Sequence, residues 1–236
     1  MRIGIIGAMD EEIENYKPRI KGIQQSSFAN ISFYQGKLGE NQVVLCKSGV
    51  GKVNSAVCTQ ILIDKFQIEK LIFTGVAGAL HPELDIGDIV ISTKAQQYDI
   101  DASPLGFEKG IIPFSKKSIF EADEELVNLA AKASKEVSNS RVFTGKILSG
   151  DKFIADVETA KELYNTFDGL CTEMEGAAVA QVCDMNEIPF VIVRSMSDKA
   201  DHSAEVNFLE FAKFAADRSC LIVDRMLTMS NVNSYE

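Results

Sequence analysis

The sequence predicts a single α/β domain. Short, bounded runs of aliphatic and β-branched residues alternate with longer segments whose apolar residues recur at helical spacing. With 236 residues, 46% of them hydrophobic, the chain can bury a sizeable core. No Pro-, Gly- or Ser-rich linker divides it, so one domain is expected over residues 1–236, with 230–236 as a loose tail.

The elements follow from these patterns in chain order. The clearest buried strand is 190–193, an apolar, largely β-branched run that Pro189 opens. Other buried strands are expected over 2–8, 71–74, 86–93, 142–148 and 170–173. A hairpin is expected from 28–35 and 42–46, with its turn at 36–41. Helices are expected over 53–66, 121–137, 156–167 (with Asp156 as N-cap), 176–185 and 204–229.

Acidic residues follow three of these strands. Strands 170–173 and 190–193 are separated by a crossover helix and are predicted to be parallel neighbours. Glu175 and Asp198 then leave the same sheet edge, where open α/β sheets bind ligands. Glu12 follows the first strand, where it is either a third member of this site or an ordinary acid in the first turn of a helix.

Composition narrows the class of protein. A net charge of -10 and a pI near 4.8 argue against a nucleic-acid or anionic-membrane partner. The five cysteines form no C-x-x-C pair and are expected to be reduced core residues. No apolar run is long enough to span a membrane, and no signal peptide is recognisable, so a cytoplasmic protein is expected.

Several kinds of chemistry find no support. His81 and His202 are the only histidines and are expected to be structural or exposed. No G-x-S-x-G or H-E-x-x-H motif occurs, and nothing calls for a metal or an organic cofactor. The segment 48–52, SGVGK, resembles a phosphate loop only superficially. The glycines of 75–78 fit either close approach of a ligand or a tight turn.

Six segments, taken together, resemble the 5′-methylthioadenosine/S-adenosylhomocysteine nucleosidase family. They are GIIGAMDEEI, SGVGKVNSA, FTGVAGAL, LSGDKFI, CTEMEGAAVAQVC and VRSMSDKAD, and they cover nearly the whole chain in order. The resemblance implies a nucleoside phosphorylase-like fold, in which helices flank a central mixed sheet. It also implies hydrolysis of the N-glycosidic bond of methylthioadenosine, adenosylhomocysteine and 5′-deoxyadenosine, in methionine salvage and adenosylhomocysteine detoxification.

The resemblance also implies residue roles. Glu12 would activate water, Asp198 would protonate adenine N7, and Glu175 would bind the ribose hydroxyls. Ser197 and Arg194 would orient Asp198. The other substrate-binding residues would be Met9, Val50, Val76, Ala77, Gly78, Phe153, Ile154, Met174 and Phe208. This division of labour needs one ionised and one neutral carboxyl group, because water requires a base whereas adenine leaves well only when protonated.

The family's active form is a homodimer whose loop around 102–113 lines the partner's 5′-alkylthio pocket. Ala102, Leu105 and Pro113 are the candidates here. Val76 stands where Ser is common, and Leu105 stands where an aromatic residue is common, so both bear on the choice of 5′ substituent. Three alternatives stay open: a phosphorolytic enzyme, a hydrolase of a modified futalosine, and a nucleoside-binding protein without catalysis.

Overall fold

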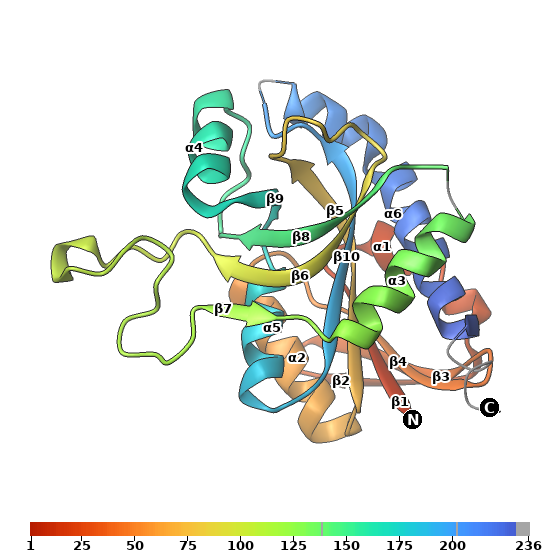
Figure 1. Ribbon diagram of the computed structural model, residues 1–236. Helices are drawn as coiled ribbons and strands as arrows, with labels where there is room; N and C mark the ends of the chain where they lie inside the picture. Colours follow the sequence, from red (N-terminus) through yellow and green to blue (C-terminus); the bar gives the residue numbers. More distant parts are fainter. Residues whose placement is uncertain (138, 202, 230–236) are drawn as a thin grey trace.

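The computed structural model describes residues 1–137, 139–201 and 203–229, which form helices around one mixed sheet (Figure 1). The expectations for His202 and for the tail 230–236 lie outside the described residues. The strands are β1 (Arg2–Gly7), β2 (Lys21–Phe28), β3 (Ile31–Leu38), β4 (Asn41–Lys47), β5 (Lys70–Ala79), β6 (Ile89–Gln97), β7 (Ile119–Glu121), β8 (Val142–Ser149), β9 (Gly169–Glu173) and β10 (Phe190–Asp198). The helices are α1 (Asp10–Ile13), α2 (Lys52–Phe66), α3 (Glu124–Val137), α4 (Val157–Phe167), α5 (Gly176–Met185) and α6 (Ala204–Met229).

Five of the strands pair in a closed circuit. β5 pairs in parallel with β10, and β10 pairs antiparallel with β6. β6 and β9 both pair in parallel with β8, and β9 pairs antiparallel with the end of β5. From β5 the sheet continues through β1 and β4 to the antiparallel strands β3 and β2. This single α/β domain with a mixed sheet confirms the predicted fold class.

Helices cover both faces of the sheet, as the alternation of side chains along β10 illustrates. Phe190 and Ile192 pack into a buried cluster with residues of α2 and α5. Val191 and Val193 point the other way, into a cluster with residues of α1, α3 and α6. Figure 1 shows α1, α3 and α6 together on one side of the strands and α2 and α5 on the other. A strand buried on both faces needs the continuous apolar run that identified it in the sequence.

Several predicted elements are confirmed. The predicted helices 176–185 and 204–229 coincide with α5 and α6. Asp156 caps α4, because its Oδ2 accepts a hydrogen bond of 2.9 Å from the Thr159 N–H. The predicted hairpin is formed by β3 and β4. All five cysteines are buried free thiols, although two that are distant in sequence, Cys46 and Cys58, bring their Sγ atoms to 3.1 Å.

Other expectations were wrong. β9 and β10 are not neighbours, since β10 lies between β5 and β6 while β9 lies between β8 and β5. Of the two alternatives left open for the glycines of 75–78, the tight turn is excluded, because β5 runs through them to Ala79. The strand predicted over 86–93 lies at Ile89–Gln97, and residues 119–121, partly assigned to a helix, form β7. β2 was missed because its residues are mostly polar and exposed.

No helix in the described part of the chain combines the length and the apolar character needed to cross a membrane.

Candidate active site

A cavity of about 290 Å³ opens where β1, β5, β9 and β10 end. Parallel strands β1, β5 and β10 bring their carboxyl ends to one edge, and β9 adds its own end beside them. The described residues that line the cavity are Ala8, Met9, Glu12, Val50, Val76, Ala77, Gly78, Phe153, Thr172, Glu173, Met174, Glu175, Ser197, Asp198 and Phe208. The three acids singled out in the sequence therefore share one cavity.

Glu12 lies in the first turn of α1 and is held by backbone donors. Its Oε2 accepts hydrogen bonds from the N–H groups of Ala8, at 2.5 Å, and Met9, at 3.1 Å. Its Oε1 accepts one from the Val76 N–H at 3.0 Å. Burial raises the pKa of Glu12, whereas Arg194 and these three N–H groups lower it. Burial outweighs the donors, so the pKa of Glu12 is raised overall, and the donors reduce the cost of the ionised form that a base requires.

Glu175 occupies the N-cap position of α5 and reaches across to the start of α2. Its Oε1 accepts a hydrogen bond of 2.7 Å from the Gly51 N–H. The segment 48–52, which resembled a phosphate loop, thus presents its backbone to a carboxylate of the same chain. Burial, followed by the nearby Glu173 carboxylate, raises the pKa of Glu175 to about 8, while Gly51 and Arg194 oppose the rise.

Asp198 ends β10 and is 2% exposed. Its Oδ1 accepts from the Ala200 N–H at 2.8 Å, and its Oδ2 accepts from the Ser197 hydroxyl at 2.9 Å. Burial raises the pKa of Asp198, and these two hydrogen bonds oppose the rise. The close approach requires glycine at position 78, where a Cβ atom would lie 2.7 Å from Asp198 Oδ1. A raised pKa is the condition that the sequence argument set for a carboxyl group that donates a proton.

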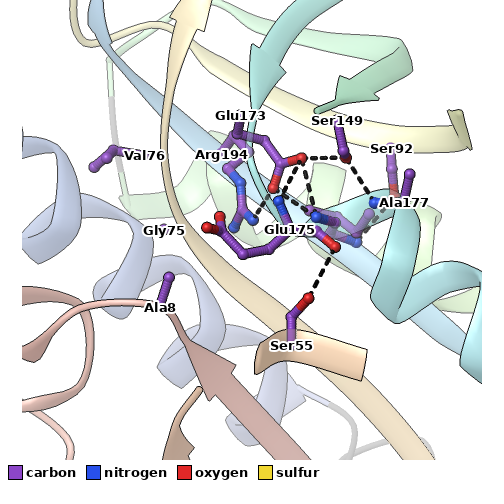
Figure 2. Close-up of polar contacts among 12 residues, drawn as sticks. Ala8, Ser55, Gly75, Val76, Ser92, Ser149, Glu173, Glu175, Ala177 and Arg194 are labelled. Carbon is purple, nitrogen blue, oxygen red and sulfur yellow. Dashed lines mark hydrogen bonds and ion pairs between the residues drawn. The ribbon is translucent and has the colours of Figure 1, made fainter. Parts of the chain in front are cut away.

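Arg194 does not lie where the sequence analysis expected it. It was expected to orient Asp198, but its Nη2 donates to Glu173 Oε2 at 2.5 Å (Figure 2). The physical reason is distance along β10: Arg194 and Asp198 are four residues apart on this strand, which at about 3.3 Å per residue separates them by roughly 13 Å. Ser197 does contact Asp198, as expected.

The remaining expected residues divide into two groups. Met9, Val50, Val76, Ala77, Gly78, Phe153, Met174 and Phe208 line the main cavity. Ile154 lines a smaller adjoining cavity together with Phe153. The rings of Phe153 and Phe208 meet edge to face, with centroids 5.7 Å apart. Ala102, Leu105 and Pro113 are not among the described residues that line either cavity.

Sequence reasoning missed Ala8, Thr172 and Glu173, which also line the main cavity. Glu173 stands two residues before Glu175 in the Glu-Met-Glu motif, so its signal was present but was attributed to its neighbour. His81 lies outside the cavity, where its ring meets Tyr164 edge to face at 5.4 Å.

Fold and site together define an α/β protein with an acid-lined ligand cavity at the carboxyl ends of its strands, and comparisons with known proteins identify its family. Residues 2–228 match the family model of the phosphorylase superfamily. A 5′-methylthioadenosine/S-adenosylhomocysteine nucleosidase of Bacillus thuringiensis subsp. konkukian (strain 97-27) is 40% identical over 228 residues, which are 96% of this chain and 98% of that protein.

Two solved structures are also similar. The nucleosidase of the same name from Neisseria meningitidis, in complex with methylthio-immucillin-A, has a TM-score of 0.92 and 37% identity, covering 96% of this chain and 98% of that one. A futalosine hydrolase mutant of Helicobacter pylori strain 26695 has a TM-score of 0.92 and 32% identity, covering 97% and 99%. The chain therefore belongs to the phosphorylase superfamily and, within it, to the 5′-methylthioadenosine/S-adenosylhomocysteine nucleosidase family.

Proposed function

We propose that this protein is a hydrolase that cleaves the N-glycosidic bond of 5′-methylthioadenosine and S-adenosylhomocysteine, and also of 5′-deoxyadenosine. The products are adenine and the 5′-substituted ribose, which places the reaction in methionine salvage and adenosylhomocysteine removal. One observation carries the proposal: a chain 40% identical to a nucleosidase of this name has Glu12, Glu175 and Asp198 on the wall of one cavity.

Glu12 is the proposed base. Its carboxylate takes a proton from water as the water attacks the anomeric carbon, where positive charge develops as the bond to adenine breaks. Three backbone N–H groups that donate to this carboxylate support the role, because they hold it in place and favour its ionised form.

Asp198 is the proposed acid. It protonates N7 of the departing adenine, which would otherwise leave as an unstable anion. Its buried position and raised pKa favour the neutral form that this step consumes. Ser197 orients it, and backbone groups of Phe153 and Ile154 bind the adenine edge.

Glu175 is proposed to bind the ribose 2′ and 3′ hydroxyl groups, with Met174 packed beneath the sugar. Both residues line the same cavity as Glu12 and Asp198. Phe208 covers the bound nucleoside, and Val76, Ala77 and Gly78, at the end of β5, line the same cavity.

Phosphorolysis is the less favourable reading of the same fold. A phosphate co-substrate needs converging Arg or Lys side chains. Among the described residues that line the cavity, the charged ones are all carboxylates: Glu12, Glu173, Glu175 and Asp198. Such a lining repels phosphate and accepts water.

Hydrolysis of a modified futalosine is the second candidate, since the futalosine hydrolase of Helicobacter pylori has the same fold over nearly the whole chain. The proposed roles of the acids would serve this substrate equally well, because the cleaved bond is the same.

Adenine release tests these readings. We expect release from methylthioadenosine, adenosylhomocysteine and 5′-deoxyadenosine, unchanged by phosphate. Release only in the presence of phosphate, with ribose 1-phosphate as product, would identify a phosphorylase. Turnover restricted to a modified futalosine would identify the second candidate. Tight adenine binding without any turnover would indicate a nucleoside-binding protein.

The residue roles are tested by matched substitutions. Glu12→Gln and Asp198→Asn should each lower kcat at least about 10²-fold, because each removes a proton-transfer group. Glu11→Gln is the control: Glu11 lies in the same turn of α1 but is exposed and is not among the described residues of the cavity lining. Near-normal turnover of either test variant would refute its assigned role.

We also propose that the active form is a homodimer in which the loop around 102–113 lines the 5′ pocket of the partner. The segment between β6 and β7 extends away from the sheet in Figure 1 and carries exposed apolar side chains. Leu105 is 70% exposed and Phe114 is 91% exposed, so this segment presents apolar side chains that a partner subunit would cover. Ala102, Leu105 and Pro113 are the proposed lining residues. Sedimentation of Leu105→Asp should show dissociation with a raised KM, and a fully active wild-type monomer would exclude this arrangement.

A further inference from the structure

Glu173 is a buried acid on the cavity wall that the proposed reaction does not use. Its side chain accepts hydrogen bonds from three directions: from Arg194 Nη2 at 2.5 Å, from the Gly176 N–H at 2.8 Å, and from the Ser149 hydroxyl. Figure 2 shows the carboxylate between Arg194 and Ser149. A carboxylate that is fixed in this way can fix the groups that donate to it, and among these Arg194 is the only charged one, in an ion pair.

Arg194 is anchored at one edge only. Its guanidinium group lies over the Phe73 ring, 4.0 Å from the ring centroid, and the residue is 1% exposed. Its Nε and Nη1 atoms are buried and have no hydrogen-bond partner within the described residues. Glu173 therefore decides the direction in which the rest of the guanidinium group points.

The free edge points toward the reacting groups. A Cβ atom built on Gly75 would lie 3.0 Å from Arg194 Nη1 and would also contact Glu12 Oε1, so both side chains converge over this glycine. In Figure 2 the Glu175 side chain lies beside the same guanidinium group. One positive charge thus lies between two carboxyl groups to which the proposed function assigns different tasks.

We propose that Glu173 is a positioning residue, which acts by aiming Arg194 at the space between Glu12 and Glu175. This inference rests on the proposed function, because it gives Glu12 and Glu175 their tasks. Glu173 itself does not bind the substrate. The ion pair also limits how much of the Arg194 charge acts on the other two acids.

The charges that surround these acids set the direction of the expected change. Glu175 is next to Glu173 on β9, Arg194 on β10 and Glu12 on α1, and it accepts from the Gly51 N–H at the start of α2. Removing the charge of Glu173 ends its repulsion of Glu175 and leaves the Arg194 charge to act on Glu12 and Glu175. Both effects lower the pKa of Glu175, and the second also lowers the pKa of Glu12.

The test uses Glu173→Gln, which keeps the shape and an acceptor oxygen but removes the charge. The acidic limb of log(kcat/KM) against pH, which reports an essential ionised group in the free enzyme, should move down by at least about 0.5 pH unit. Ser149→Ala is the matched control, because it removes a neutral partner of the same carboxylate. It should leave the limb within about 0.2 unit of the wild type. An unmoved limb in Glu173→Gln, or an equal shift in both variants, would overturn the proposal.

Glu173→Asp provides a second measurement that does not depend on how Glu173→Gln folds. It keeps the charge, but it is one methylene group shorter and cannot reach Arg194 in the same way. The acidic limb should stay in place while the plateau kcat falls at least about 10-fold, since a misdirected group costs rate without changing the charge. A wild-type kcat in this variant would show that aiming Arg194 is unnecessary.

Failure of the proposed function can be told apart from failure of this inference. If the wild type releases no adenine, the proposed function fails, and ¹³C-carboxyl NMR titration of Glu12 and Glu175 tests Glu173 without any turnover. The Glu173→Gln variant should then still titrate at lower pH at both positions. Identical titration in the wild type and the variant would overturn the inference.

Discussion

Gly75→Ala is a sharp test of the proposed base, because it disturbs the Glu12 carboxylate without altering any group that takes part in the reaction. The new Cβ atom would collide with Glu12 Oε1 and would lie 3.0 Å from Arg194 Nη1. Gly75 is paired with Arg194 in the centre of the β5–β10 ladder, so the backbone has little freedom to move away. The carboxylate must therefore give way.

The size of the effect follows from the contacts that Glu12 would lose. Its Oε1 accepts a hydrogen bond of 3.0 Å from the Val76 N–H, and movement away from Gly75 breaks this bond first. Misplacing a reacting group by about 1 Å costs on the order of 10²-fold in rate. We therefore expect kcat to fall by about 10²-fold. The affinity for adenine should be nearly unchanged, because Glu12 is assigned to the attacking water and not to adenine.

Adenine release gives kcat, and calorimetric titration with adenine gives the affinity. Gly145→Ala is the control. Its Cβ atom would lie 2.5 Å from Leu170 Cδ1, so the steric overlap is similar but involves an apolar side chain that is not among the described residues lining the cavity. The reasoning is refuted if folded Gly75→Ala keeps kcat within about 3-fold of the wild type, which would mean that the position of Glu12 does not limit the rate.

Three further outcomes are expected. Ionising Glu175 in the fold is unfavourable, because its pKa rises from 4.5 to about 8. The contribution of the neutral Glu175 side chain to the free energy of unfolding is therefore complete below about pH 4.5 and is lost as the pH rises toward 8. Between pH 4.5 and pH 7, urea titrations should show that the wild type loses about 3 kcal/mol more unfolding free energy than Glu175→Gln. Parallel pH dependences of the two proteins would contradict this. Arg194→Met leaves Glu173 buried without its ion-pair partner and should lower the unfolding free energy by about 3–5 kcal/mol. Adding Glu173→Gln should restore part of this loss of stability. A loss under about 1 kcal/mol in the single variant would be inconsistent with the buried pair. Phe208→Ala removes the edge-to-face contact with Phe153 and a wall of the cavity. It should raise the Kd for adenine, a product that is not consumed, about 10-fold by calorimetry, and an unchanged Kd would place the adenine elsewhere.

The parts of the fold that the sequence predicted are those with a local signal. The run at 190–193 is apolar on both faces and forms the start of β10, and the helical periodicity of 204–229 matches α6 to the residue. Asp156 was recognisable as an N-cap because capping depends only on neighbouring residues.

The failures share a dependence on partners that are distant in sequence. Glycine is common in turns, so nothing local indicated that β5 continues through Gly75 and Gly78, where strand pairing and close approach of acids require glycine. The pairing of β9 with β5 and β8, in place of β10, depends on the closed circuit of strands.

The candidate site shows the same limit. Glu12, Glu175 and Asp198 were predicted together because each follows a strand, and the cavity brings them together. The resemblance implied that Arg194 orients Asp198, but the two residues lie four positions apart on β10, roughly 13 Å at about 3.3 Å per residue, and Arg194 pairs with Glu173 instead. Glu173 belongs to another strand, β9, so the local sequence around Arg194 could not identify this partner.

The contact between Gly51 and Glu175 has a consequence for how precisely a sugar can be held. Glu175 Oε1 accepts one hydrogen bond from a backbone donor, which leaves a second acceptor site on Oε1 and both sites on Oε2 for hydroxyl groups. The Gly51 N–H thus fixes the orientation of the carboxyl group before a ribose arrives and after the product departs, without competing for the same acceptor site.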